Sequence, residues 1–204
     1  MMKKEFQRIR DFYRASLSHY LFITAVAFVA LLFISFVVGV IFKDLSANIM
    51  EWFSQQVAQI GVADDEGNFS AIALFFNNTR AMTLSILFGL IPFAYFTALN
   101  LGTNSMLIGL FAAVFVNSGR SLGYYLMGLL PHGVFEIPAM ILSIACGIYL
   151  CEVVTENCRH KKEGAVKAAI SNIFPIYFLI ILPLVARAAI TETYITPAVL
   201  QAIL

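Results

Sequence analysis

Long apolar stretches alternate with short polar ones along this chain, at the spacing of membrane-spanning helices. From Tyr20 to Phe42 no charged residue interrupts the apolar run. At about 1.5 Å per residue, such a run crosses a hydrocarbon core of about 30 Å. It is too long for the apolar part of a cleaved signal peptide, and no small-residue cleavage pattern closes it. The pattern therefore predicts a first span at 20–42 that stays in the protein.

The later apolar stretches are interrupted by glycine, proline and asparagine. Asn100 to Asn104 has the best turn composition, so we expect an inner turn there, and Pro92 should kink the span before it. Residues 118–133 hold a short apolar core among glycines and prolines, which is more typical of a re-entrant segment than of a span. The remaining spans are expected at 81–99, 104–117, 134–154 and 168–190.

Four polar segments separate or flank these spans. Residues 1–19 place Lys and Arg between apolar residues at helical spacing, which predicts an amphipathic head on the membrane surface with its apolar side in the headgroups. Residues 43–79 should form an outer loop with interfacial helices and an acidic turn at 64–68. A basic loop is expected at 155–167 and an outer tail at 191–204.

Composition agrees with a membrane protein. The chain is 60% hydrophobic and 12% charged, whereas a soluble domain is about 45–50% apolar and about 25% charged. These values predict one all-α domain, a polytopic transmembrane bundle of about five spans in contact with membrane lipids. A net charge of +1 gives no electrostatic case for nucleic acid.

The distribution of basic residues predicts the orientation. The head carries five Lys or Arg and the loop at 155–167 carries four, which together are nine of the 13 in the chain. By the positive-inside rule both segments belong in the cytoplasm, so an even number of crossings must separate them. Four spans satisfy this condition if 118–133 does not cross. We therefore expect a multi-pass protein of the cytoplasmic membrane with its N-terminus inside and its C-terminus outside.

Three blocks of sequence resemble the stage II sporulation protein M family. The most distinctive runs from Leu130 to Ala139 and reads LPHGVFEIPA. A second runs from Phe75 to Arg80 (FFNNTR), followed by Gly89, Asn104 and Gly109, and a third combines Ala188–Ala189 with Glu192 and Tyr194–Pro197. Ser105 and Thr191 depart from the Asn-Gly and Ile-Glu pairs that are frequent in the family, which leaves the subfamily open.

This resemblance implies a membrane protein of about five spans without known catalysis. In spore formers such proteins hold peptidoglycan-remodelling enzymes together, so a scaffold that docks envelope partners is the first functional expectation. Similar chains outside spore formers have no settled role, and the resemblance therefore does not imply sporulation itself.

The expected topology gathers polar residues on the outer side. Glu136 begins an outward-to-inward span, and a charge inside a span costs at least about 2.5–3.5 kcal/mol unless it has a partner or a cavity. His132 precedes it by four residues, on the same face if the helix includes it. We predict one outer polar cluster that binds an ion, a lipid headgroup or a partner: Asn77, Asn78, Arg80, Arg120, His132, Glu136, Arg187 and Glu192. A structural alternative is that Glu136 pairs with Arg187 or Arg120 and locks broken helices together.

No catalytic motif, cofactor motif or metal motif is found in the sequence. Cys146, Cys151 and Cys158 form no CxxC pair or zinc spacing, and no phosphate-binding loop or catalytic triad pattern occurs. We therefore expect no enzyme, no cofactor and no metal. Two alternatives to the scaffold remain. One is a transporter or channel for ions, small solutes or lipids, expected as a homodimer because five spans make a small pore. The other is the membrane subunit of an ATPase-driven transporter that docks at 155–167.

Overall fold

The computed structural model describes residues 2–60 and 70–202, so the acidic turn predicted at 64–68 lies outside the described residues. Five helices among the described residues are long and apolar enough to cross a membrane: Lys4–Ile41, Ala71–Leu90, Thr97–Asn117, Leu122–His160 and Ala165–Gln201. The described ranges hold no strand. The prediction of an all-α bundle with about five spans is confirmed.

Most of the five long segments consist of several helical elements. The first consists of α1 (Met2–Phe12), a π-helical turn at Tyr13–Leu17 and α2 (Ser18–Ile41), after which α3 (Lys43–Ile60) follows. Next come α4 (Ala71–Leu87) with a 3-10 turn at Phe88–Leu90, α5 (Thr97–Asn117) and α6 (Leu122–His160). The last segment contains α7 (Ala165–Ile176), α8 (Leu182–Ile190) and α9 (Thr196–Gln201), which are separated by π-helical turns at Tyr177–Ile181 and Thr191–Ile195.

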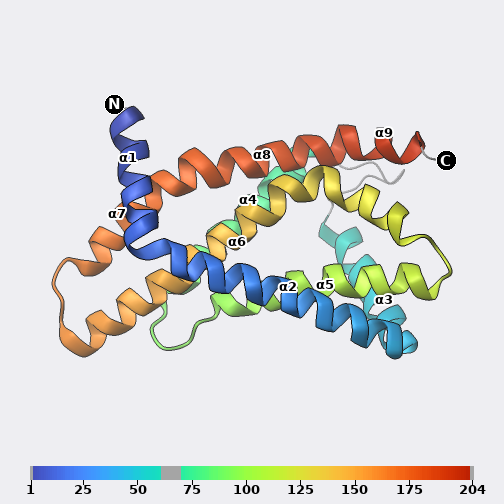
Figure 1. The fold of residues 1–204 in the computed structure, drawn as a ribbon, viewed down its shortest axis with the longest axis horizontal. Helices are drawn as coiled ribbons and strands as arrows, with labels where there is room; N and C mark the ends of the chain where they lie inside the picture. The colour runs from blue at the N-terminus through green and yellow to red at the C-terminus, as the bar shows by residue number, and fades with distance from the viewer. Residues whose placement is uncertain (1, 61–69, 203–204) are drawn as a thin grey trace.

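The bundle has two distinct ends (Figure 1). The N-terminal helix, the turn at 91–96 and the loop at 161–164 lie at one end, which we call the basic end. The turn at 118–121 and the C-terminal helix lie at the other, which we call the far end. The two segments richest in Lys and Arg thus share one end of the molecule.

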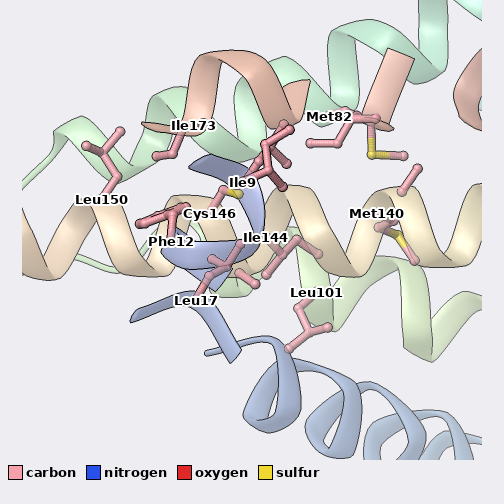
Figure 2. Close-up of a cluster of buried hydrophobic side chains, with 14 of the residues drawn as sticks. Ile9, Phe12, Leu17, Met82, Leu101, Met140, Ile144, Cys146, Leu150 and Ile173 are labelled. Atoms are coloured by element: carbon pink, nitrogen blue, oxygen red, sulfur yellow. The ribbon is translucent and has the colours of Figure 1, made fainter. Parts of the chain in front are cut away.

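The tight core lies in the half of the bundle nearer the basic end. Figure 2 shows its buried side chains gathered around the middle of α6, among them Ile144, Cys146 and Leu150. Helices approach closely where glycines face backbone: a Cβ added at Gly147 would overlap the Ser85 carbonyl oxygen, and one at Gly109 would overlap the Leu32 carbonyl oxygen. Toward the far end, the Asn117 amide donates a hydrogen bond of 2.8 Å to the Gly39 carbonyl and ties α5 to α2.

The turn between the second and third spans is not at Asn100–Asn104 but at 91–96. Asn100 and Asn104 both lie inside α5, where the Asn104 amide nitrogen donates to Asn100 Oδ1 over 2.6 Å. The turn is held instead by α6, because Thr155 Oγ1 accepts a hydrogen bond of 3.0 Å from the Phe93 backbone N–H. Pro92 consequently lies in the turn and kinks no span. The composition of 100–104 is that of a turn, but Asn104 bonds to Asn100 within α5 and Asn100 bonds to α4.

The segment at 118–133 is not a separate re-entrant piece. After a tight turn in which Gly119 has a φ of 70°, Ser121 caps α6 by accepting a hydrogen bond of 3.1 Å from the Gly123 N–H. The helix then continues to His160 with Pro131 and Pro138 inside it, and Figure 1 shows it bent. Prolines inside a helix cause such bends and are tolerated where neighbouring helices support the chain. At about 1.5 Å per residue, the 39 residues of α6 extend well beyond a hydrocarbon core of about 30 Å.

Four polar segments also differ from expectation. Part of the apolar side of the N-terminal head packs on protein, since Ile9, Phe12 and Leu17 are buried in the core, whereas Phe6 and Tyr13 stay exposed. The outer loop ends before residue 79, because Ser70 caps α4 and the helix begins at Ala71. The basic loop is short, because α6 extends to His160, and the tail at 191–204 is helical as far as Gln201.

Candidate binding cavity

A cavity of about 580 Å³ lies between the first half of α6, α4, α5 and the C-terminal segment. Apolar and aromatic side chains make up most of its wall, including Phe115, Tyr124 and Leu200. Its polar lining residues come from four different parts of the chain: Asn77, Asn78, Asn104, His132, Glu136 and Glu192. A mostly apolar cavity with a few convergent polar groups is the usual form of a ligand site.

The centre of this polar lining is formed by His132, Glu136 and Glu192. One ligand atom from each residue lies within 4.8 Å of the other two. His132 and Glu136 are one helical turn apart on α6 and therefore share a face. Glu192 comes from the π-helical turn at Thr191–Ile195, a type of helical irregularity that is frequent at functional sites.

A threonine of the C-terminal segment orients the imidazole. His132 Nδ1 lies 3.3 Å from Thr196 Oγ1, and this hydroxyl donates to the Thr191 carbonyl over 3.2 Å. Because the hydroxyl proton is used there, the Thr196 oxygen accepts from Nδ1–H. The lone pair of the neutral imidazole is therefore on Nε2.

The two carboxylates have no cationic partner in the described part of the chain. Within residues 2–60 and 70–202, neither Glu136 nor Glu192 forms a salt bridge or accepts a hydrogen bond, and the charged group that acts on Glu192 is Glu136. The expected pairing of Glu136 with Arg187 or Arg120 is therefore not found. Arg120 lies instead over the Phe115 ring, with 5.8 Å from its guanidinium carbon to the ring centroid.

The structure thus brings together five of the eight residues of the predicted outer cluster. Asn77, Asn78, His132, Glu136 and Glu192 line the cavity, while Arg80, Arg120 and Arg187 do not. Arg80 and Arg187 are exposed on the outside of α4 and α8. Spacing along a helix predicts depth in the bundle, but the direction of a side chain around the helix depends on packing.

Beyond the cavity, polar side chains continue toward the basic end. Asn104 lines the cavity and donates to Asn100, and Asn100 donates to the Ser85 hydroxyl. The Ser85 carbonyl accepts from Thr97 Oγ1 over 2.9 Å. Asn104 is therefore part of the site and not an inner turn residue, a position that the sequence did not reveal. Thr196 was not predicted as a site residue, although it stands in the third motif block at Tyr194–Pro197.

Comparisons with known proteins agree with the motif resemblance. A family model described as stage II sporulation protein M matches residues 19–197. An uncharacterized protein of Methanocaldococcus jannaschii is 30% identical over 164 residues, which cover 80% of this chain and 90% of the relative. No solved structure matches the chain.

Proposed function

Because the chain belongs to the stage II sporulation protein M family, we propose that it is a non-enzymatic membrane scaffold that docks an envelope protein. The partner binds along the outside of α4 and α8 and toward the far end, which faces out of the cell. The N-terminus and the loop at 161–164 are cytoplasmic in this proposal, in agreement with the positive-inside rule.

The observation that supports docking is a pair of exposed arginines inside membrane-spanning segments. Arg80 lies within the candidate span Ala71–Leu90, and Arg187 lies within Ala165–Gln201. Both face away from the bundle, since the buried residues of α4 and α8 lie on the opposite faces of these helices. Within the described residues neither forms a salt bridge.

An arginine at a lipid-facing position is costly. Insertion scales assign at least about 2.5–3.5 kcal/mol to Arg at the centre of a span, and such residues usually pair or mark a functional surface. Arg80 also continues an exposed stripe with Ile72 and Phe76, whose side chains are 71% and 65% exposed. A partner helix with an acidic residue beside apolar ones would cover this stripe and neutralise the arginine.

Partner capture tests this proposal. Native membranes are crosslinked, and the protein is purified in mild detergent and analysed by mass spectrometry, for the wild type, the double variant Arg80→Ala/Arg187→Ala and the control Lys167→Ala. Lys167 is also exposed but lies close to the loop at 161–164. We expect a stoichiometric envelope protein with the wild type and the control and its loss with the double variant. Recovery of the chain only with itself, or of a partner insensitive to both arginines, contradicts the proposal.

A transporter or channel is the second candidate, and the polar side chains beyond the cavity favour it. The cavity reaches Asn104, and the contacts from Asn104 to Asn100 and Ser85 extend a polar path toward the basic end. Near this path, Gly89 packs directly against the backbone of Gly147, so the two helices are in close contact there. The arrangement resembles a vestibule open on one side, which a homodimer could use in alternating access.

Flux measurements separate the two candidates. Proteoliposomes with the purified protein are loaded with ions, small solutes or fluorescent lipids, and release is followed for the wild type and for Glu136→Gln. Steady, substrate-dependent flux that Glu136→Gln abolishes supports transport. If no flux is found for ions, small solutes or lipids, the scaffold explains the protein better than a transporter does.

A further inference from the structure

We infer that His132, Glu136 and Glu192 bind one divalent transition-metal ion, which joins α6 to the C-terminal segment across the cavity. This inference rests on the geometry of the three side chains and does not depend on the scaffold proposal. It adds a metal site where the sequence motifs indicate none.

The three side chains place their ligand atoms within reach of a common ion after side-chain rotation. A zinc ion has ligand distances of about 2.0–2.2 Å in tetrahedral geometry, so its ligand atoms lie roughly 3.4 Å from one another. The three candidate atoms lie within 4.8 Å of one another. Side-chain rotations that shorten the longer of these distances by roughly 1 Å would complete the site.

The unpaired carboxyl group of Glu136 is an independent indication of a bound cation. Glu136 is partly buried, and it lines the cavity together with Glu192. It has no hydrogen-bond donor or salt-bridge partner among the described residues, and Glu192 adds a second carboxyl group of the same charge. Two carboxylates in a low-dielectric site repel each other strongly. A divalent cation between them removes this repulsion.

The contact between His132 and Thr196 leaves one imidazole nitrogen free to bind an ion. Nδ1 donates to Thr196, so the lone pair on Nε2 is available for an ion. Metal-binding histidines usually donate their other ring N–H to such a partner, which fixes the tautomer and the ring orientation. Thr196 is therefore a positioning residue of the site.

The donor set selects the class of ion. Imidazole suits zinc, iron and nickel, whereas carboxylates also suit manganese and magnesium, so one imidazole with two carboxylates favours Zn²⁺ or Mn²⁺ over Mg²⁺. Three protein ligands leave at least one coordination position for water or for a ligand in the cavity. The cavity of about 580 Å³ has room for that group beside the ion.

Metal titration tests the inference. The full-length protein is purified in mild detergent, freed of metal with a chelator and titrated with Zn²⁺, Mn²⁺ or Mg²⁺ by calorimetry, with bound metal counted by mass spectrometry. The variants are Glu136→Gln, Glu192→Gln and, as a control, Glu163→Gln, whose side chain is exposed in the short loop after α6. We expect one ion per chain, Zn²⁺ or Mn²⁺ bound more tightly than Mg²⁺, and at least about 100-fold weaker binding in both cavity variants, since even the outer partners of metal ligands change affinity about 10–100-fold.

A second variant keeps the test decisive if the glutamine variants do not fold. Glu192→Cys is made in a Cys158→Ser background, because Cys158 is the exposed cysteine among the three, and the protein is loaded with Co²⁺. A thiolate-to-cobalt charge-transfer band that the background lacks supports the site. Absence of the band, or Zn²⁺ binding that is equally tight in the wild type and in both glutamine variants, overturns the inference. Failure of the wild type to bind any of the three ions also overturns it.

Discussion

Arg8 Nε donates a hydrogen bond of 3.1 Å to Asn172 Oδ1 and joins the N-terminal helix to α7. The same guanidinium donates from Nη2 to Ser171 Oγ over 2.6 Å. Together with the buried side chains of Ile9 and Phe12, these contacts fix α1 on the bundle. The head thus packs on the basic end of the bundle rather than standing free of it.

Replacement of Arg8 should loosen the N-terminal helix. Hydrogen bonds from charged groups contribute about 1.5–3 kcal/mol, and the partial exposure of this guanidinium lowers the expected effect to about 1–2 kcal/mol. We expect Arg8→Ala to lower the free energy of unfolding by that amount, measured by denaturant titration in detergent. Arg10→Ala is the matched control, since among the described residues Arg10 forms an ion pair only with the neighbouring Asp11 at 3.7 Å, and both side chains are well exposed. Equal stability of the two variants would show that the Arg8 contacts do not hold α1.

Two glycines in helices test the close packing of the core. Ala is intrinsically better than Gly inside a helix by about 0.5–1 kcal/mol. At Gly102 an added Cβ meets no atom within 4 Å, whereas at Gly147 it overlaps the Ser85 carbonyl oxygen and lies 2.7 Å from Thr97 Cγ2. We therefore expect Gly102→Ala to leave the melting temperature unchanged or raise it, and Gly147→Ala to destabilise the fold by about 1–3 kcal/mol. A melting temperature for Gly147→Ala at or above that of Gly102→Ala would contradict the packing of α4 on α6.

The number of spans could be predicted from the sequence because it depends on local hydrophobicity alone. The turn at 91–96 could not, because it depends on contacts between distant residues. Phe93 and Tyr95 adopt positive φ values of 65° and 46° there, which composition does not favour, and Thr155 holds the turn from α6. The asparagines at 100 and 104 instead find partners inside the bundle. Local composition cannot distinguish a solvated turn from a buried polar contact.

The candidate site was partly predictable for a similar reason. The spacing of His132 and Glu136 and the expected topology were sufficient to group them with Glu192. The arginines were assigned to the same depth, but Arg187 lies on the face of α8 opposite to Val185 and Ala189. The sequence also gave no reason to expect that the two carboxylates would lack a cation, and this is the feature that points to a metal.

The polar contacts beyond the cavity should be important for stability. Asn100 donates to the Ser85 hydroxyl and the Ala81 carbonyl and accepts from Asn104. Asn100→Ala leaves Asn104 Nδ2 with only the Asn100 backbone carbonyl and deprives Ser85 of a donor. Loss of such buried contacts costs about 1–3 kcal/mol. Thr103→Ala is the control because its exposed hydroxyl contacts only nearby backbone, and surface changes stay within about 0.5 kcal/mol. If the two variants unfold at the same denaturant concentration, the asparagine contacts do not stabilise the bundle.

The proposed orientation predicts which cysteines an impermeant reagent can reach. Cys158 is exposed near the basic end of α6, and Ser121 is exposed in the turn at the far end. If the positive-inside rule sets the topology, a membrane-impermeant maleimide added to intact cells should label Ser121→Cys in a Cys158→Ser background but not Cys158 in the wild type. Cys146 and Cys151 are buried and should stay unlabelled in both proteins. Permeabilised cells provide the control, since Cys158 must then react. Labelling of Cys158 in intact cells would invert the orientation and place the far end on the cytoplasmic side, where an envelope partner could not reach it.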